Sequence, residues 1–145
     1  MKKFVLVPVV LFSVVSLIGL ASAQSLKQKD MIASDLPRVA ELATKTNQAC
    51  GTKISFKLDY STYADVLNDV NNQSPWAYLA NATDALQKIC TTAAGKQAVQ
   101  AKIKSVIVSH ASKEFETLTG TVFRYGVPYS GHSPATVVDW LQNHL

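Results

Sequence analysis

The residue types best suited to chemistry stand together near the C-terminus, in the stretch VPYSGHSPATVVDW at residues 127–140. Ser130 and Ser133 lie on either side of His132, and Asp139 follows further along the same stretch. A serine nucleophile, a histidine base and a carboxylate that orients the base are the parts of a catalytic triad. The stretch therefore raises the question of nucleophilic catalysis.

The spacing of these residues favours a helix start over a triad. Side chains of adjacent residues diverge, so they rarely reach the hydrogen-bond geometry that a triad needs. The G-x-S-x-G nucleophile elbow is also absent from the sequence. Ser133 suits the N-cap of a helix, Pro134 its first turn and Gly131 the turn before it. We assign no catalytic residue to the chain.

The other reactive side chains are dispersed. No pair among His110, His132 and His144 has the i, i+4 spacing that builds a zinc site on a helix, and we expect no metal and no other cofactor. Glu114 and Glu116 point to the same side of a predicted strand. Two glutamates on an exposed strand are more typical of a solvated face than of a glycosidase pair, which needs carboxyl groups ~5 Å apart in a cleft.

The N-terminal residues have the pattern of a secretory signal peptide. Lys2 and Lys3 precede an apolar run at residues 4–20, and Ala-Ser-Ala follows at residues 21–23. We expect cleavage after Ala23, which leaves residues 24–145 as a single small domain with no membrane-spanning segment. The short basic start is typical of bacteria and indicates export to the periplasm or the medium.

The charge balance argues against two classes of partner. The formal net charge of the whole chain is +4, and Lys2 and Lys3 in the predicted signal peptide contribute half of it. A mature domain with so small a net charge has no electrostatic drive toward nucleic acid or an anionic membrane. We expect neither as a partner.

Two cysteines, Cys50 and Cys90, predict one disulfide. An even number of cysteines in an oxidising compartment favours a bridge. No His, Cys, Asp or Glu stands two to four residues from either cysteine, which argues against a metal site. The C-x-x-C pattern of redox-active pairs is also absent, so the predicted role of the bridge is structural.

Hydrophobic periodicity divides the mature chain into helices and strands. Ser34 or Asp35 is expected to cap the first helix, with Pro37 in its first turn and Gly51 as its end. We expect helices at residues 34–50, 62–70, 76–90, 91–104 and 134–145, a strand within residues 52–61, a second strand at residues 105–110 and a hairpin at residues 113–127.

Strands that follow one another closely favour antiparallel pairing. We therefore expect an α+β domain in which a mainly antiparallel sheet of about four strands carries helices on one face, with one disulfide. The other sheet face would be open, basic at one edge and apolar in the middle. The residues assigned to it are Lys53, Lys57, Val106, Val108, Leu118, Val122 and Arg124. An apolar strip rimmed by charge indicates a partner-binding surface.

The sequence thus favours a non-enzymatic interaction protein, secreted or periplasmic, with another protein as its partner. An inhibitor, an immunity protein or an envelope accessory factor would fit. One alternative is a small secreted hydrolase with a dispersed site that uses His132 or Glu116. Another is a carrier whose internal cavity is lined by residues such as Phe56 and Phe123. The partner and the oligomeric state stay open.

Overall fold

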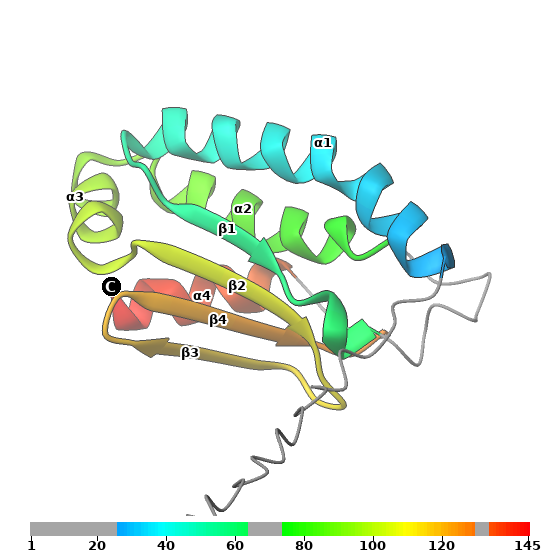
Figure 1. Cartoon of the computed structure of the whole chain (residues 1–145). Helices are drawn as coiled ribbons and strands as arrows, with labels where there is room; N and C mark the ends of the chain where they lie inside the picture. Colours follow the sequence, from blue (N-terminus) through cyan, green and yellow to red (C-terminus); the bar gives the residue numbers. More distant parts are fainter. Residues whose placement is uncertain (1–25, 64–73, 130–133) are drawn as a thin grey trace, which may run out of the picture.

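A four-stranded sheet lies at the centre of the computed structural model, which describes residues 26–63, 74–129 and 134–145 (Figure 1). The strands are β1 (Ser55–Leu58), β2 (Ser105–His110), β3 (Phe115–Thr119) and β4 (Val122–Val127). Their order across the sheet is β1-β2-β4-β3. The described helices are α1 (Leu26–Cys50), α2 (Trp76–Ile89), α3 (Ala93–Lys102) and α4 (Pro134–His144), with a short 3₁₀ helix η1 (Tyr60–Tyr63). The predicted α+β class is confirmed.

The sheet is mixed, so the expectation of mainly antiparallel pairing is wrong. β1 pairs with β2 and β2 with β4 in parallel, and only β3 runs antiparallel to its neighbour β4. The chain returns through α2 and α3 before β2, and such a crossover brings the next strand back in the same direction. β4 then inserts between β2 and β3, so these two consecutive strands do not pair.

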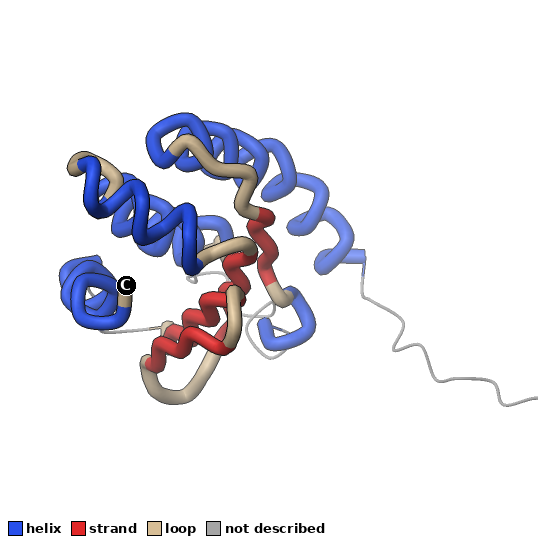
Figure 2. Tube along the Cα trace, turned by 90° about the vertical axis from the view of Figure 1, so that its left-hand side faces the viewer, coloured by secondary structure: helices blue, strands red, loops and turns tan. Residues whose placement is uncertain are grey.

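The helices gather on one side of the sheet. α2 and α4 pack against each other over one face, while α1 lies along α2 beside the β1 edge (Figures 1 and 2). α3 lies at the end where β2 begins (Figure 1). No described α-helix covers the opposite face (Figure 2).

α1 begins earlier than its sequence predicts. It starts at Leu26 and continues through Pro37, which lies inside the helix. Proline lacks the N–H that would bond the carbonyl four residues earlier, so this intrahelical hydrogen bond is missing where α1 passes Pro37. The Ser34 hydroxyl donates to the carbonyl of Met31 at 2.8 Å, within the helix. Gly51, with φ of 65°, ends α1 in the left-handed conformation, as expected.

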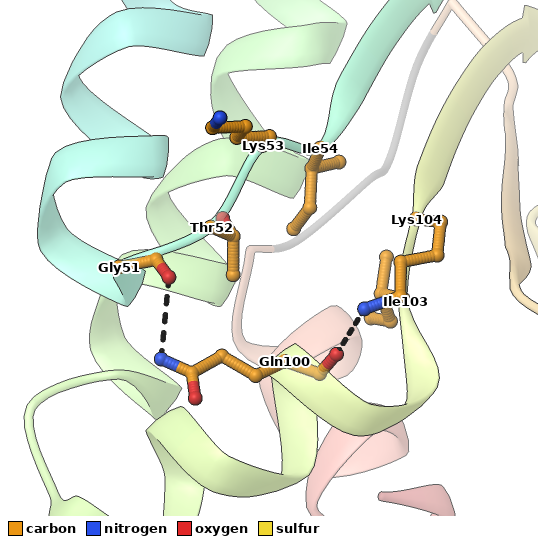
Figure 3. Close-up of a pocket in the computed structure, with 7 residues that line it drawn as sticks. All are labelled: Gly51, Thr52, Lys53, Ile54, Gln100, Ile103 and Lys104. Atoms are coloured by element: carbon orange, nitrogen blue, oxygen red, sulfur yellow. Dashed lines mark hydrogen bonds between the residues drawn. The ribbon is translucent and has the colours of Figure 1, made fainter.

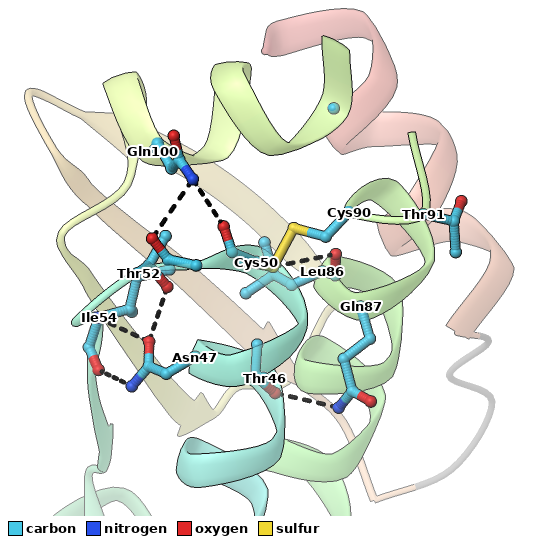
Figure 4. Close-up of a disulfide and its surroundings, with 12 residues drawn as sticks. Thr46, Asn47, Cys50, Thr52, Ile54, Leu86, Gln87, Cys90, Thr91 and Gln100 are labelled. Atoms are coloured by element: carbon cyan, nitrogen blue, oxygen red, sulfur yellow. Dashed lines mark hydrogen bonds between the residues drawn. A yellow bond between two sulfur atoms is a disulfide. The ribbon is translucent and has the colours of Figure 1, made fainter. Parts of the chain in front are cut away.

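The predicted disulfide between Cys50 and Cys90 is present and joins the C-terminal ends of α1 and α2 (Figure 4). The Cα atoms of the two residues lie 5.1 Å apart. The Gln100 side chain donates to the Cys50 carbonyl at 2.9 Å, which ties α3 to the same place. The Asn47 side chain accepts from the backbone N–H of Ile54 at 2.8 Å and donates to its carbonyl at 3.0 Å. This corner of the fold is therefore held by one covalent and several polar links.

Candidate functional site

All five tyrosines of the chain gather around the carboxyl ends of the parallel strands. These residues are Tyr60, Tyr63, Tyr78, Tyr125 and Tyr129. The Tyr63 and Tyr78 rings stack with their centroids 6.1 Å apart, and the Tyr129 ring meets them edge-on at 6.5 and 6.4 Å. We call this group the tyrosine cluster.

His110, the last residue of β2, adjoins the tyrosine cluster. Its ring stacks on Tyr129 with the centroids 3.7 Å apart, and its Nδ1 lies 3.0 Å from the carbonyl oxygen of Val127. A carbonyl only accepts, so Nδ1 is the donor in this contact. The described partners of this ring are thus a carbonyl and tyrosine rings. These contacts pack the histidine and orient it.

Burial raises the pKa of the Tyr60, Tyr63 and Tyr125 hydroxyls above that of a free tyrosine. The phenols are therefore protonated at neutral pH and are not nucleophiles, and those of Tyr60 and Tyr125 donate hydrogen bonds to Asp35 and Glu114. The Tyr63 hydroxyl is buried and has no hydrogen-bond partner among the described residues. This chemistry fits a packed aromatic core with polar tips.

Asp35 on α1 lies buried beside this cluster, with 1% of its surface exposed. It accepts hydrogen bonds from the Ser74 hydroxyl, from the Tyr60 hydroxyl at 3.4 Å and from the backbone N–H of Trp76. Burial raises the pKa of the carboxyl group, against the lowering effect of these bonds and of Arg38. Asp35 therefore caps the start of α2. The prediction that it caps the first helix is wrong, because α1 begins nine residues earlier.

Glu114 and Glu116 lie at the border of the covered sheet face. The Glu114 carboxylate accepts from the Tyr125 hydroxyl and from the Thr136 hydroxyl, each at 3.0 Å, and so joins β4 to α4. Burial and the neighbouring Glu114 raise the pKa of Glu116. The bonds of Glu114 give it a structural role, which leaves a glycosidase pair without specific support.

A hollow of about 560 Å³ lies at the opposite end of the sheet, between the loop before β1 and α3 (Figure 3). Thr52, Lys53, Gln100 and Lys104 supply its polar side chains. The Gln100 amide donates to the Gly51 carbonyl at 3.3 Å, and the Lys104 ammonium donates to the Gln100 carbonyl. Gln100 thus already links α3 to the end of α1. Lys53 precedes β1, so it lies at the rim of this hollow and not within the sheet.

The open face of the sheet carries a row of residues that the strand register aligns. Lys57 of β1, Ile107 of β2 and Arg124 of β4 are register partners, and Thr117 of β3 completes the row. The lysine and the arginine are exposed and the isoleucine is partly exposed. The rows on either side share this face and contain Ser55, Ser105, Ser109, Phe115, Thr119, Val122 and Gly126.

Of the seven residues predicted to form this face, three lie on it and four do not, among them Lys53, which precedes β1. Lys57, Val122 and Arg124 lie on it, whereas Val106, Val108 and Leu118 lie on the covered face. Both valines are fully buried, and Leu118 is partly buried against the core. Ile103 ends α3, and the alternation of β2 begins at Ser105, which turns Val106 and Val108 toward the covered face.

The Phe115 ring covers the backbone of Gly126 at one corner of the open face. A Cβ atom on Gly126 would lie 2.0 Å from a ring carbon of Phe115, so this ring lies directly over the glycine backbone. Phe115 is 39% exposed. The signal for this pair was present in the sequence as an aromatic and a glycine on the two arms of one hairpin.

In the stretch at residues 127–140, three of the residues considered for catalysis lie outside the described residues: Ser130, His132 and Ser133. Asp139 is exposed on α4. Within residues 26–63, 74–129 and 134–145, no three His, Cys, Asp or Glu side chains are placed to hold a metal ion. In the same part of the chain, no helix is both long and apolar enough to cross a membrane.

Comparison with protein-family models, curated proteins and solved structures finds no match to this chain.

Proposed function

We propose that this chain is an exported, non-enzymatic interaction protein that binds another protein through the open face of its sheet. Its place of action in this proposal is the periplasm or the exterior of a bacterium, after removal of residues 1–23. The remaining residues 24–145 act as one small domain. The N-terminal pattern and the disulfide support export, because disulfides persist in oxidising compartments.

The observation that carries the proposal is the row Lys57–Ile107–Arg124. Adjacent strands lie ~4.8 Å apart, so the Cα atoms of Lys57 and Arg124 stand ~10 Å apart with the isoleucine between them. Within the four strands, the open face has no carboxylate. Asp59, just beyond β1, already accepts a hydrogen bond from the Ser61 hydroxyl. An apolar centre with a charged rim is the usual anatomy of an interface. The partner would carry acidic groups on both sides of an apolar patch.

The frame behind this face is rigid enough to present it. Val106, Val108, Phe123 and Tyr125 fill the covered side of the two central strands and are fully buried. Phe123 also stacks on Trp140 of α4, with centroids 5.6 Å apart. This phenylalanine therefore fills the space between sheet and helix, which leaves the ligand-carrier alternative without specific support.

The test uses matched charge reversals. The double variant Lys57→Glu/Arg124→Glu reverses the open face, while Lys88→Glu/Lys96→Glu reverses two exposed lysines on α2 and α3. Each pair changes the net charge by the same amount. The wild-type mature protein serves as bait in periplasmic extract of its source, with chemical cross-linking and mass spectrometry.

Support requires a captured protein that the open-face variant loses and the control variant keeps, with cross-links to the row around Ile107. Capture alone does not count. Equal retention by both variants, or cross-links confined to the helices, would refute the proposal.

A further inference from the structure

β3 forms one edge of the sheet, and no described strand pairs with its outer side. β3 contacts β4 on one side and α4 beneath, and Figure 1 shows it at the border of the sheet. The other edge strand, β1, is four residues long, carries Lys57 and lies against α1. Short length, lysine and a covering helix are devices that protect edge strands from pairing. β3 has no proline, lysine or glycine within its five residues.

The hairpin turn and the pairing register determine which backbone groups of β3 point away from β4. Thr119 and Val122 are register partners, so Gly120 and Thr121 form a two-residue turn. Gly120 has φ of 58°, which is typical of a type II′ turn, and such a turn is closed by a hydrogen-bonded residue pair. Hydrogen-bonded and non-hydrogen-bonded pairs alternate along the ladder. The N–H and C=O groups of Glu116 and Leu118 therefore point away from β4.

We propose that a second copy of this chain pairs with this edge, β3 against β3 and antiparallel, with the two-fold axis at Thr117. Glu116 of each copy then lies opposite Leu118 of the other, and their four outward N–H groups meet four outward C=O groups. All five residues of β3 find partners. The partly exposed Phe115 lies opposite Thr119 of the other copy.

Charge and the pairing of Phe115 select this register among its neighbours. A shift of the axis to Glu116 would place two glutamates directly opposite each other, which is destabilising. A shift to Leu118 would leave Phe115 beyond the end of the partner strand. The axis at Thr117 avoids both. The dimer would have one eight-stranded sheet with both open faces on the same side, since the axis runs perpendicular to the sheet. The inference does not depend on the proposed function of that face.

The test uses Thr117, because in the proposed dimer this residue lies opposite Thr117 of the other copy. Thr117 is exposed, so substitutions there are expected to fold. Protein expressed from the full-length chain and recovered in oxidised form is measured by light scattering after size exclusion across a concentration series. We expect a concentration-dependent dimer for wild type. Thr117→Lys and Thr117→Glu each place like charges across the axis and should raise the dimer Kd about tenfold. Mixing the two variants should restore dimers.

The matched control is Thr119→Lys, which adds the same charge to the same strand away from the axis and should dimerise more tightly than Thr117→Lys. Amide hydrogen exchange provides a readout without substitution: the N–H groups of Glu116 and Leu118 should gain protection as wild-type concentration rises. A wild-type monomer at all concentrations, or a dimer equally stable in both Thr117 variants, would overturn the proposal.

Discussion

Replacing Asp35 by alanine is expected to lower the free energy of unfolding by about 3 kcal/mol. The carboxylate accepts from the Ser74 hydroxyl, the Tyr60 hydroxyl and the Trp76 N–H, while the side chain is 1% exposed. Each donor left without a partner costs about 1 kcal/mol, and the Trp76 bond is also the cap of α2. The three losses together give the estimate.

The measurement is urea unfolding at neutral pH followed by tryptophan fluorescence, since Trp76 adjoins the site. Asp84→Ala is the control, because Asp84 is exposed on α2 and its loss should change stability by less than about 0.5 kcal/mol. If Asp35→Ala and Asp84→Ala shift the unfolding free energy equally, Asp35 does not connect α1 to α2.

The same carboxyl group predicts a pH dependence. Burial raises its pKa in the folded state above the ordinary value of 3.8, so the folded chain binds this proton more tightly than the unfolded chain does. The contribution of Asp35 relative to an Asp35→Asn variant is therefore greatest below pH 3.8 and declines as the pH rises through the folded-state pKa. A difference that grows with pH in this range would contradict the assigned burial.

Three further predictions test the frame of the fold. Replacing Cys50 and Cys90 together by serine should cost about 4 kcal/mol, measured by urea unfolding, because the bridge closes a 40-residue separation; an unchanged midpoint would show that the bridge adds nothing. Val106→Lys should prevent folding, as judged by circular dichroism, whereas Ile107→Lys should fold; the opposite outcome would reverse the two sheet faces. Gly120→Ala should lower the free energy of unfolding by about 1 kcal/mol, measured by thermal unfolding, because φ is 58° and a Cβ atom there would meet no atom within 4 Å, so only backbone strain is added. An unchanged stability would argue against the left-handed turn.

The open face shows how far alternation alone can predict a surface. In β1, apolar and polar residues alternate strictly, and Lys57 falls on the expected side. In β2, the run of Val106, Ile107 and Val108 fits either phase, because all three are apolar and β-branched. The register with Phe123 and Tyr125 of β4 settles the phase and turns both valines inward. No local signal distinguishes the two phases.

The tyrosine cluster could not be predicted from local pattern either. Its members are spread from residue 60 to residue 129, with no shared spacing. Only the parallel arrangement of β1, β2 and β4 brings their carboxyl ends to one side. Asp35 is a similar case: its type and its neighbours suit an N-cap, but the helix whose start it caps lies 41 residues further along the chain.

The sequence by itself determined the features that depend on near neighbours. These are the α+β class, the end of α1 at Gly51, the hairpin turn at Gly120 and, from cysteine number and the expected compartment, the bridge between Cys50 and Cys90. Tertiary structure alone decided which strands pair, in which direction, and which side of β2 faces the helices. Strand direction depends on how the whole chain returns across the sheet, and the energy of that choice is spread over contacts far apart in sequence.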